Sequence, residues 1–258
     1  PIMDHMPVNH VPIRVIVCAG DDLTVVMPAR HALKFTERFL DRFETTFETA
    51  IGAVEPLSDL RLSACAGIAF VKAKYPFVQA YELCESLCGS AKNQLERKHS
   101  GVAWHRITTS GVSSFDDIVK REFTLPGPND KEKTVLSMMP YTVHPVEGFC
   151  RIEAMLQLLE AMKKMPRGSV RELVSTMYRG HAPADVAFAR IRQIAADEGK
   201  SKQSFSAFVE ALKQLTGSTD NQPLWQVLSG QDSRTIRTPM LDAVELRAAV
   251  GKDKEKRA

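Results

Sequence analysis

Two adjacent carboxylates stand at the centre of a short pattern near the start of the chain. Asp21 and Asp22 follow Gly20 and separate two β-branched apolar runs, at residues 15–19 and 23–26. Two such runs joined by a glycine-aspartate turn predict a β-hairpin with the carboxylates at its tip. This tip suits phosphoryl transfer, because Mg²⁺ prefers hard oxygen ligands and must be held where a nucleotide's phosphates can reach it.

Gly20 supports this interpretation, since a residue without a Cβ lets the backbone approach a nucleotide closely. Aspartate is also an ordinary turn residue. Taken alone, Ala19-Gly20-Asp21-Asp22 is more simply explained as a turn without a catalytic role. The surrounding elements must therefore decide between the two.

Length and composition describe an ordinary globular chain. Its 258 residues suffice for one large or two modest domains, and 44% of them are hydrophobic and 25% charged. A net charge of +3 is too small to indicate nucleic-acid binding by charge alone. No apolar run approaches the ~20 residues of a membrane span. The first residues do not form a signal peptide, so we expect a cytoplasmic protein.

The five cysteines indicate buried thiols in a reducing compartment, because they are odd in number and most lie in apolar patterns. Cys84 and Cys88 could share a helix face. No second Cys/His pair at zinc-finger spacing accompanies them, so a zinc site is not expected.

The first half of the chain alternates strands and helices. The hairpin strands are expected at about 12–18 and 23–28, and apolar residues then recur at helical spacing from Ala32 to about Ile51. A strand at 60–71, a helix from Pro76 to about Lys98 and a strand at 102–107 follow. One face of the second helix is marked by Phe77, Tyr81, Cys84, Cys88, Ala91 and Leu95. The order predicts an α+β layer with both helices on one face of a mainly antiparallel sheet.

Beyond Thr108 the alternation stops. Helical patterns occupy about 148–164, 168–178, 183–198, 202–216 and 239–250. We therefore predict these units: an N-terminal loop or cut end (1–11), a first domain (12–110), a linker (111–130), a mostly helical domain (131–250) and a disordered tail (251–258).

Residues 12–110 resemble the palm domain shared by nucleotidyl cyclases and polymerases, the GGDEF-like superfamily. They are most similar to the second palm of the large subunit of type III CRISPR effector complexes, whose Gly-Gly-Asp-Asp hairpin makes cyclic oligoadenylate. The matching pieces are 19–23 on the hairpin, 63–69 on the next strand, 74–77 before the second helix and 90–92 within it. More weakly, 139–142 and 166–168 resemble the C-terminal helical domain of those subunits. The resemblance implies a ferredoxin-like palm followed by a mostly helical domain.

The resemblance also implies site residues. Asp21 and Asp22 would be the catalytic, metal-binding carboxylates, with Mg²⁺ or Mn²⁺ as cofactor. Ala19 and Gly20 would contact ATP or another nucleoside triphosphate. Lys92 would contact the triphosphate, where a point charge suits a phosphate, although a solvated helix lysine explains this residue equally well.

Two departures from the family pattern stand out. The first glycine of the family's motif is Ala19 here, which adds a methyl group near the nucleotide. Palms also begin with a strand and a helix before this hairpin, and that strand supplies another metal-ligating carboxylate and a central place in the sheet. Residues 1–11 are too few for both elements, so either the chain is a C-terminal piece of something longer or another segment completes the sheet.

Three functional hypotheses remain open. The leading one is a Mg²⁺-dependent nucleotidyltransferase or cyclase that drives a ribose hydroxyl onto the α-phosphate of ATP. The alternative is an inactive palm that serves as a nucleotide-binding or scaffold module. The third is a diguanylate-cyclase-like activity, since these residues do not encode base specificity. Expected partners are protein subunits docked on the helical half and RNA in the full complex.

Overall fold

The computed structural model describes residues 12–52, 54, 60–108, 114–127, 132–196, 199–219, 223–229 and 233–251. The predicted N-terminal loop and all of the predicted tail except Gly251 lie outside these ranges. Among the helices described, none is long and apolar enough to cross a membrane.

The predicted hairpin is confirmed. Strands β1 (Arg14–Ala19) and β2 (Asp22–Val26) pair antiparallel and form a two-stranded sheet of their own. Every residue of β1 is exposed. A two-stranded ribbon is marginally stable by itself, so this one depends on the elements beside it.

Both predicted helices of the first half are also confirmed, and each starts directly after a proline. Helix α1 spans Ala29–Ile51, one turn longer at its start than expected, and α2 spans Phe77–Gln94. Proline fits a helix start because the first turn needs no backbone N–H donor.

The larger sheet of this half is mixed, so the prediction of a mainly antiparallel sheet was wrong. Strand β3 (Cys65–Phe70) pairs parallel with β4 (Gly101–Arg106), because α2 carries the chain back to the end where β3 began. Two short strands extend the sheet in the order β3-β4-β7-β8; they are β7 (Tyr141–Thr142) and β8 (Cys150–Arg151).

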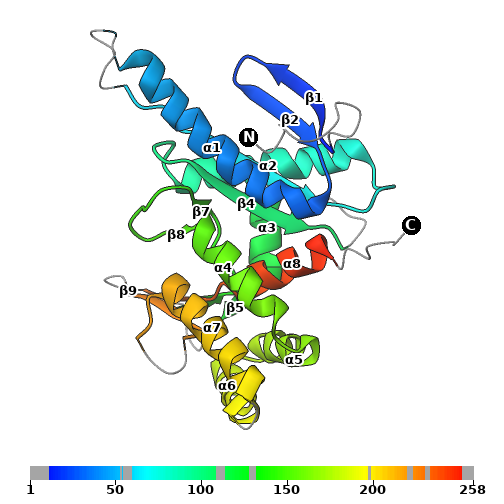
Figure 1. Cartoon of the computed structure of the whole chain (residues 1–258), viewed down its shortest axis with the longest axis vertical. Coiled ribbons are helices and arrows are strands. Elements are labelled where there is room, and N and C mark those ends of the chain that lie inside the picture. Colours follow the sequence, from blue (N-terminus) through cyan, green and yellow to red (C-terminus); the bar gives the residue numbers. More distant parts are fainter. Residues whose placement is uncertain are drawn as a thin grey trace.

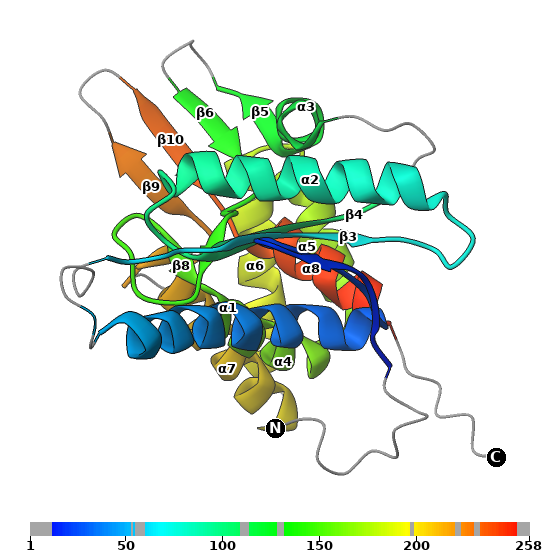
Figure 2. The same cartoon turned by 90° about the horizontal axis from the view of Figure 1, so that it is seen from above.

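The two long helices cover opposite faces of this sheet rather than the same face. Figure 2 shows α2 on one side of β3 and β4 and α1 on the other. Gly67 permits the close contact of β3 with α2, since a Cβ there would lie 2.1 Å from the carbonyl oxygen of Cys84. Helix α1 covers its own face with the buried residues Ala32, Leu33 and Leu40.

The hairpin does not share the sheet of β3, which corrects a further prediction. Its ladder is confined to β1 and β2, and within the described residues the outer edge of β3 pairs with no strand. The hairpin and β3 stay in separate sheets because, within the described residues, no strand lies between them to bridge their edges. This is the central place that the palm resemblance assigns to a first strand.

The segment 111–130, expected as a linker, contains ordered structure. Helix α3 (Phe115–Ile118) continues into a π-helical turn, η2 (Val119–Phe123), and then into strand β5 (Thr124–Pro126). Phe115 and Phe123 are both buried in the core. These aromatic side chains anchor the segment beneath α2.

The five helical patterns of the second half are confirmed within a few residues. A small sheet, in the order β5-β6-β10-β9, accompanies these helices and was not predicted (Figure 1). The elements are α4 (Ile152–Lys163), α5 (Arg167–Met177), α6 (His181–Ala196), α7 (Gly199–Thr216), α8 (Met240–Val250), β6 (Glu132–Val135), β9 (Gln226–Ser229) and β10 (Arg234–Arg237).

The two halves share packing. Strands β7 and β8 come from the second half and extend the sheet of the first, while α8 packs against β4 and α1. One cluster of buried apolar residues runs from Leu83 on α2 through Trp104 on β4 to Leu246 on α8. One sheet therefore contains strands from before and after residues 111–130, whereas we expected two separate domains joined by a linker. The domain boundaries stay a prediction.

Candidate nucleotide and metal site

The hairpin tip gathers four of the five predicted site residues. Ala19 pairs with Asp22, which leaves Gly20 and Asp21 as a two-residue loop. Gly20 has φ +60° and Asp21 does not have positive φ, as in a type II′ turn with glycine at its first loop position. A Cβ on Gly20 would meet no atom within 4 Å, so the backbone on this side is open to a ligand.

Asp21 and Asp22 are both exposed, and within the described residues neither carboxylate forms a hydrogen bond or an ion pair. Across the same residues, no group of three or more His, Cys, Asp or Glu side chains is placed to hold a metal ion. Mg²⁺ commonly binds through one or two carboxylates plus the phosphates of a substrate. The two free carboxylates fit that mode, with the nucleotide supplying the remaining ligands.

The tip lies within electrostatic reach of α2. Burial raises the pKa of Cys88, the charge of Lys92 lowers it, and the carboxylates of Glu85 and Asp22 raise it further. The pKa of the Tyr81 phenol is raised mainly by Glu85 and to a smaller extent by Asp22. Tyr81 and Cys88 of α2 therefore lie within electrostatic reach of the Asp22 carboxylate, and Lys92 follows Cys88 by one helical turn.

These α2 residues form a stripe along the helix. Tyr81, Glu85, Cys88 and Lys92 follow one another at spacings of four, three and four, which places them on one side. Tyr81 and Glu85 are exposed, and Cys88 and Lys92 are half-buried. This stripe brings the fifth predicted residue, Lys92, to the side of α2 that the hairpin tip faces.

Sequence reasoning missed Tyr81 and Glu85 as neighbours of the site. It used Tyr81 only as one of the residues that mark a face of this helix, whereas the residues buried on α2 are Leu83, Leu87, Ser90 and Ala91. The signal that could have found the stripe is the helical register that leads back from Lys92 through Cys88 to Tyr81.

Cys88 of the stripe and Cys65 beneath it are packing residues. The Cys88 thiol donates a hydrogen bond of 3.1 Å to the carbonyl oxygen of Cys65, and burial raises the pKa of Cys65 to about 11. Thiols with raised pKa stay protonated at neutral pH and are poor nucleophiles. Their contribution is to hold α2 against β3.

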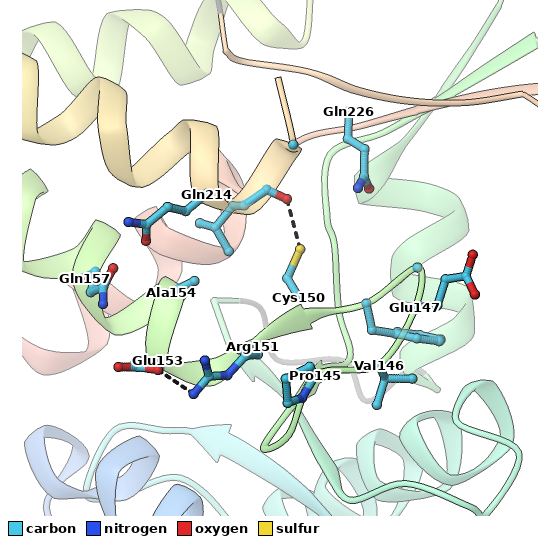
Figure 3. A pocket seen from close by; sticks show the side chains of 14 residues that line it. Pro145, Val146, Glu147, Cys150, Arg151, Glu153, Ala154, Gln157, Gln214 and Gln226 are labelled. Carbon is cyan, nitrogen blue, oxygen red and sulfur yellow. Dashed lines mark hydrogen bonds and ion pairs between the residues drawn. The ribbon is translucent and has the colours of Figure 1, made fainter. Parts of the chain in front are cut away.

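A separate cavity of about 760 Å³ opens between β8, the start of α4 and the end of α7 (Figure 3). Two of its charged groups neutralise each other, since Arg151 pairs with Glu153 at 2.5 Å. The Cys150 thiol donates to the Leu215 carbonyl oxygen, and burial raises its pKa to about 11. The cavity therefore offers no activated nucleophile, and the carboxylate pair of the hairpin remains the better candidate site.

Comparison with known proteins finds a family match in the half of the chain that carries the hairpin. The family model for the second palm domain of Cas10/Cmr2 matches residues 6–100, and no curated protein matches the chain. The matched segment contains the hairpin, α1, β3 and α2, and so all five predicted site residues. That domain is the cyclase palm of the large subunit of type III CRISPR complexes. Over residues 6–100, the chain therefore matches the second palm domain of the Cas10/Cmr2 family.

Proposed function

We propose that this palm is a Mg²⁺-dependent nucleotidyltransferase that links ATP molecules into a cyclic oligoadenylate. The observation that carries the proposal is the exposed pair Asp21 and Asp22 on a glycine-containing turn, inside the segment that matches the palm family. Partner protein subunits docked on the helices of the second half, and RNA in the full complex, belong to the same proposal.

Each residue has a chemical role in this proposal. The carboxylates of Asp21 and Asp22 hold Mg²⁺ or Mn²⁺, which when bound lowers the pKa of the attacking ribose hydroxyl and stabilises the leaving pyrophosphate. Gly20 leaves room for the nucleotide beside the backbone, and Ala19 lines the same approach. Lys92 offsets the charge of the triphosphate from the neighbouring helix.

The proposal includes a strand that fills the space between the hairpin and β3. Both neighbours have unused hydrogen-bonding edges in the described part of the chain, because β3 pairs only with β4 and the hairpin only with itself. Val15, Ile16 and Val17 of β1 are exposed apolar side chains that such a completed sheet would help to cover. The strand comes from a segment outside the described residues or from a partner.

The test is the double change Asp21→Ala and Asp22→Ala in a protein whose sheet is complete. We expect Mg²⁺-dependent conversion of ATP to linked products to be lost, while the free energy of unfolding changes by about 0.5 kcal/mol or less, as for exposed side chains. The matched control is the double change Asp116→Ala and Asp117→Ala, which removes another exposed adjacent pair, on α3. Activity should survive the control, with a loss of stability from the helix cap that Asp117 helps to form and from the hydrogen bond that Asp116 accepts from Ser90 at 3.1 Å.

The alternative function is a palm without activity that binds nucleotide or partners as a scaffold. Ala19 in place of the family's glycine and the unfilled edge of β3 favour it. A completed, folded, ATP-binding protein that gives no product with Mg²⁺ or Mn²⁺, with or without an activating RNA, would establish this alternative. The same assay with GTP tests the diguanylate-cyclase-like hypothesis.

A further inference from the structure

Two aromatic side chains lie exposed on the first turns of α2. Phe77 is 48% exposed and Tyr81 is 38% exposed, and their ring centroids are 6.3 Å apart with the planes tilted by 31°. Neighbouring Val78 is 65% exposed. Single exposed apolar residues are ordinary, but a contiguous aromatic group beside a candidate site is typical of a ligand-binding surface.

The Tyr81 ring of this pair lies within electrostatic reach of the hairpin tip. Tyr81 interacts electrostatically with Asp22 across the space between α2 and β2, and with Glu85 one turn further along its own helix. A nucleotide held at the carboxylate tip is long enough to reach the exposed rings of this pair.

The stripe on α2 has the length and polarity of a nucleoside triphosphate. Lys92 lies eleven positions after Tyr81, which is about 16 Å along the helix axis, and the two residues lie on nearly the same side of the helix. An aromatic surface stands at one end and a cation at the other, with Asp22 opposite the part between them. Glu85, next to Tyr81, can accept hydrogen bonds from ribose hydroxyls or base amino groups.

We propose that Tyr81, together with Phe77, is the stacking platform for the base of the bound nucleoside triphosphate, whose triphosphate runs along α2 toward Lys92. This inference rests on the proposed function and adds the orientation of the substrate. Stacking on an aromatic side chain accepts any base, because every base has a π-face. Tyr81 thus contributes affinity and position, and leaves the choice of base to other contacts.

The test compares two ligands, ATP and inorganic tripolyphosphate. Each is titrated calorimetrically, with Mg²⁺ present, into the same protein as in the activity assay, in which a strand fills the space between the hairpin and β3. Removal of a stacked aromatic side chain costs roughly 5- to 150-fold in affinity. We expect Tyr81→Ala to weaken ATP binding by this factor and to leave tripolyphosphate binding unchanged. Tyr81→Phe, which keeps the ring, should stay within about twofold of wild type.

Tyr178→Ala is the matched control, because Tyr178 is similarly exposed, at 45%, and follows α5 in the other half of the chain. It should change neither affinity. Tyr81→Trp adds a spectroscopic signal, since a stacked base should quench the new indole beyond any change seen in wild type, where Trp104 is fully buried and Trp225 is half-buried in the other half of the chain.

The outcomes separate this inference from the proposed function. Unchanged ATP affinity in Tyr81→Ala, or an equal loss for both ligands, would overturn the platform while leaving the carboxylate site intact. ATP binding that depends on Tyr81 but survives the double change of Asp21 and Asp22 would support the platform and overturn the metal site. No binding of either ligand by wild type would overturn both.

Discussion

Ala19 and Asp22 are the last cross-strand pair of the hairpin, so the turn that carries the carboxylates has only two residues. A two-residue turn fixes the direction of both aspartates, because its backbone conformation allows little freedom. The geometry of the proposed site therefore depends on whether Gly20 can keep its positive φ.

Gly20→Ala should destabilise the hairpin, because an L-residue at φ +60° is strained by about 1–2 kcal/mol. The change is local, so amide hydrogen exchange of β1 and β2 is the suitable measurement, and we expect faster exchange there. Gly89→Ala is the control, since Gly89 lies inside α2 and an added Cβ there would meet nothing within 4 Å. It should raise global stability by up to about 1 kcal/mol. Unchanged hairpin exchange in Gly20→Ala would show that the turn tolerates a side chain.

Gly67→Ala should destabilise the whole palm. Its Cβ would lie 2.1 Å from the Cys84 carbonyl oxygen and 2.9 Å from the Leu87 Cβ, so α2 must move away from β3. Overpacking of this kind costs about 1–3 kcal/mol, measured by urea unfolding. Gly168→Ala on α5, where a Cβ meets nothing within 4 Å, should cost nothing. Because α2 carries Lys92, the Gly67 variant should also bind ATP more weakly, and equal stability of the two variants would contradict this packing.

The sequence predicted the elements better than their arrangement. Helices α1 and α4 to α8 were predictable because apolar residues recur over several turns, and the hairpin because a glycine-aspartate turn joins two β-branched runs. The candidate site could be predicted for the same reason. Ala19, Gly20, Asp21 and Asp22 are contiguous, so local structure alone brings them together.

What the sequence did not predict depends on contacts between distant segments. The parallel pairing of β3 and β4 follows from the α2 crossover and could have been deduced, but the addition of β7 and β8 joins residues about 40 positions apart in the chain. The exposed side of α2 was misassigned because Tyr81 and Leu83 are both apolar. Only the position of β3 and α3 decides which of them is buried.

Lys92→Ala should raise KM for ATP and leave kcat close to wild type, because a lysine that touches the triphosphate stabilises substrate and transition state alike. A charge-assisted contact is worth about 1.5–3 kcal/mol, which corresponds to roughly 10- to 150-fold in KM. Lys72→Ala is the control, since Lys72 is exposed just after β3 and should change neither constant. A fall in kcat with unchanged KM would instead place Lys92 in a contact made only in the transition state.

The last prediction concerns a carboxyl that links the two halves of the chain. Asp242 on α8 is fully buried, and its Oδ2 accepts hydrogen bonds from the Tyr141 hydroxyl at 2.7 Å and from the Met138 backbone N–H at 2.8 Å. Its Oδ1 has no partner within the described residues. Burial raises the pKa of Asp242 from 3.8 to about 7; these hydrogen bonds and one from Ser137 lower it, and the nearby Glu245 raises it.

Asp242 should therefore make the protein less stable as pH rises from about 4 to about 7. Between these two pKa values the native state binds a proton that the unfolded state has released. The stability that this proton contributes is fully present below the unfolded pKa of 3.8 and is lost as pH rises through the folded pKa of about 7. The slope can reach about 1.4 kcal/mol per pH unit.

Asp242→Asn keeps an oxygen acceptor for Tyr141 and Met138 but cannot ionise. We expect urea unfolding to show that this variant gains stability relative to wild type as pH rises from 5 to 8. Asp116→Asn, on the exposed surface of α3, should give a difference from wild type that does not change over the same range. If the difference in free energy of unfolding between Asp242→Asn and wild type also stayed constant from pH 5 to 8, Asp242 would not be the group that titrates. The connection between α8 and the palm sheet would then be insensitive to pH in this range.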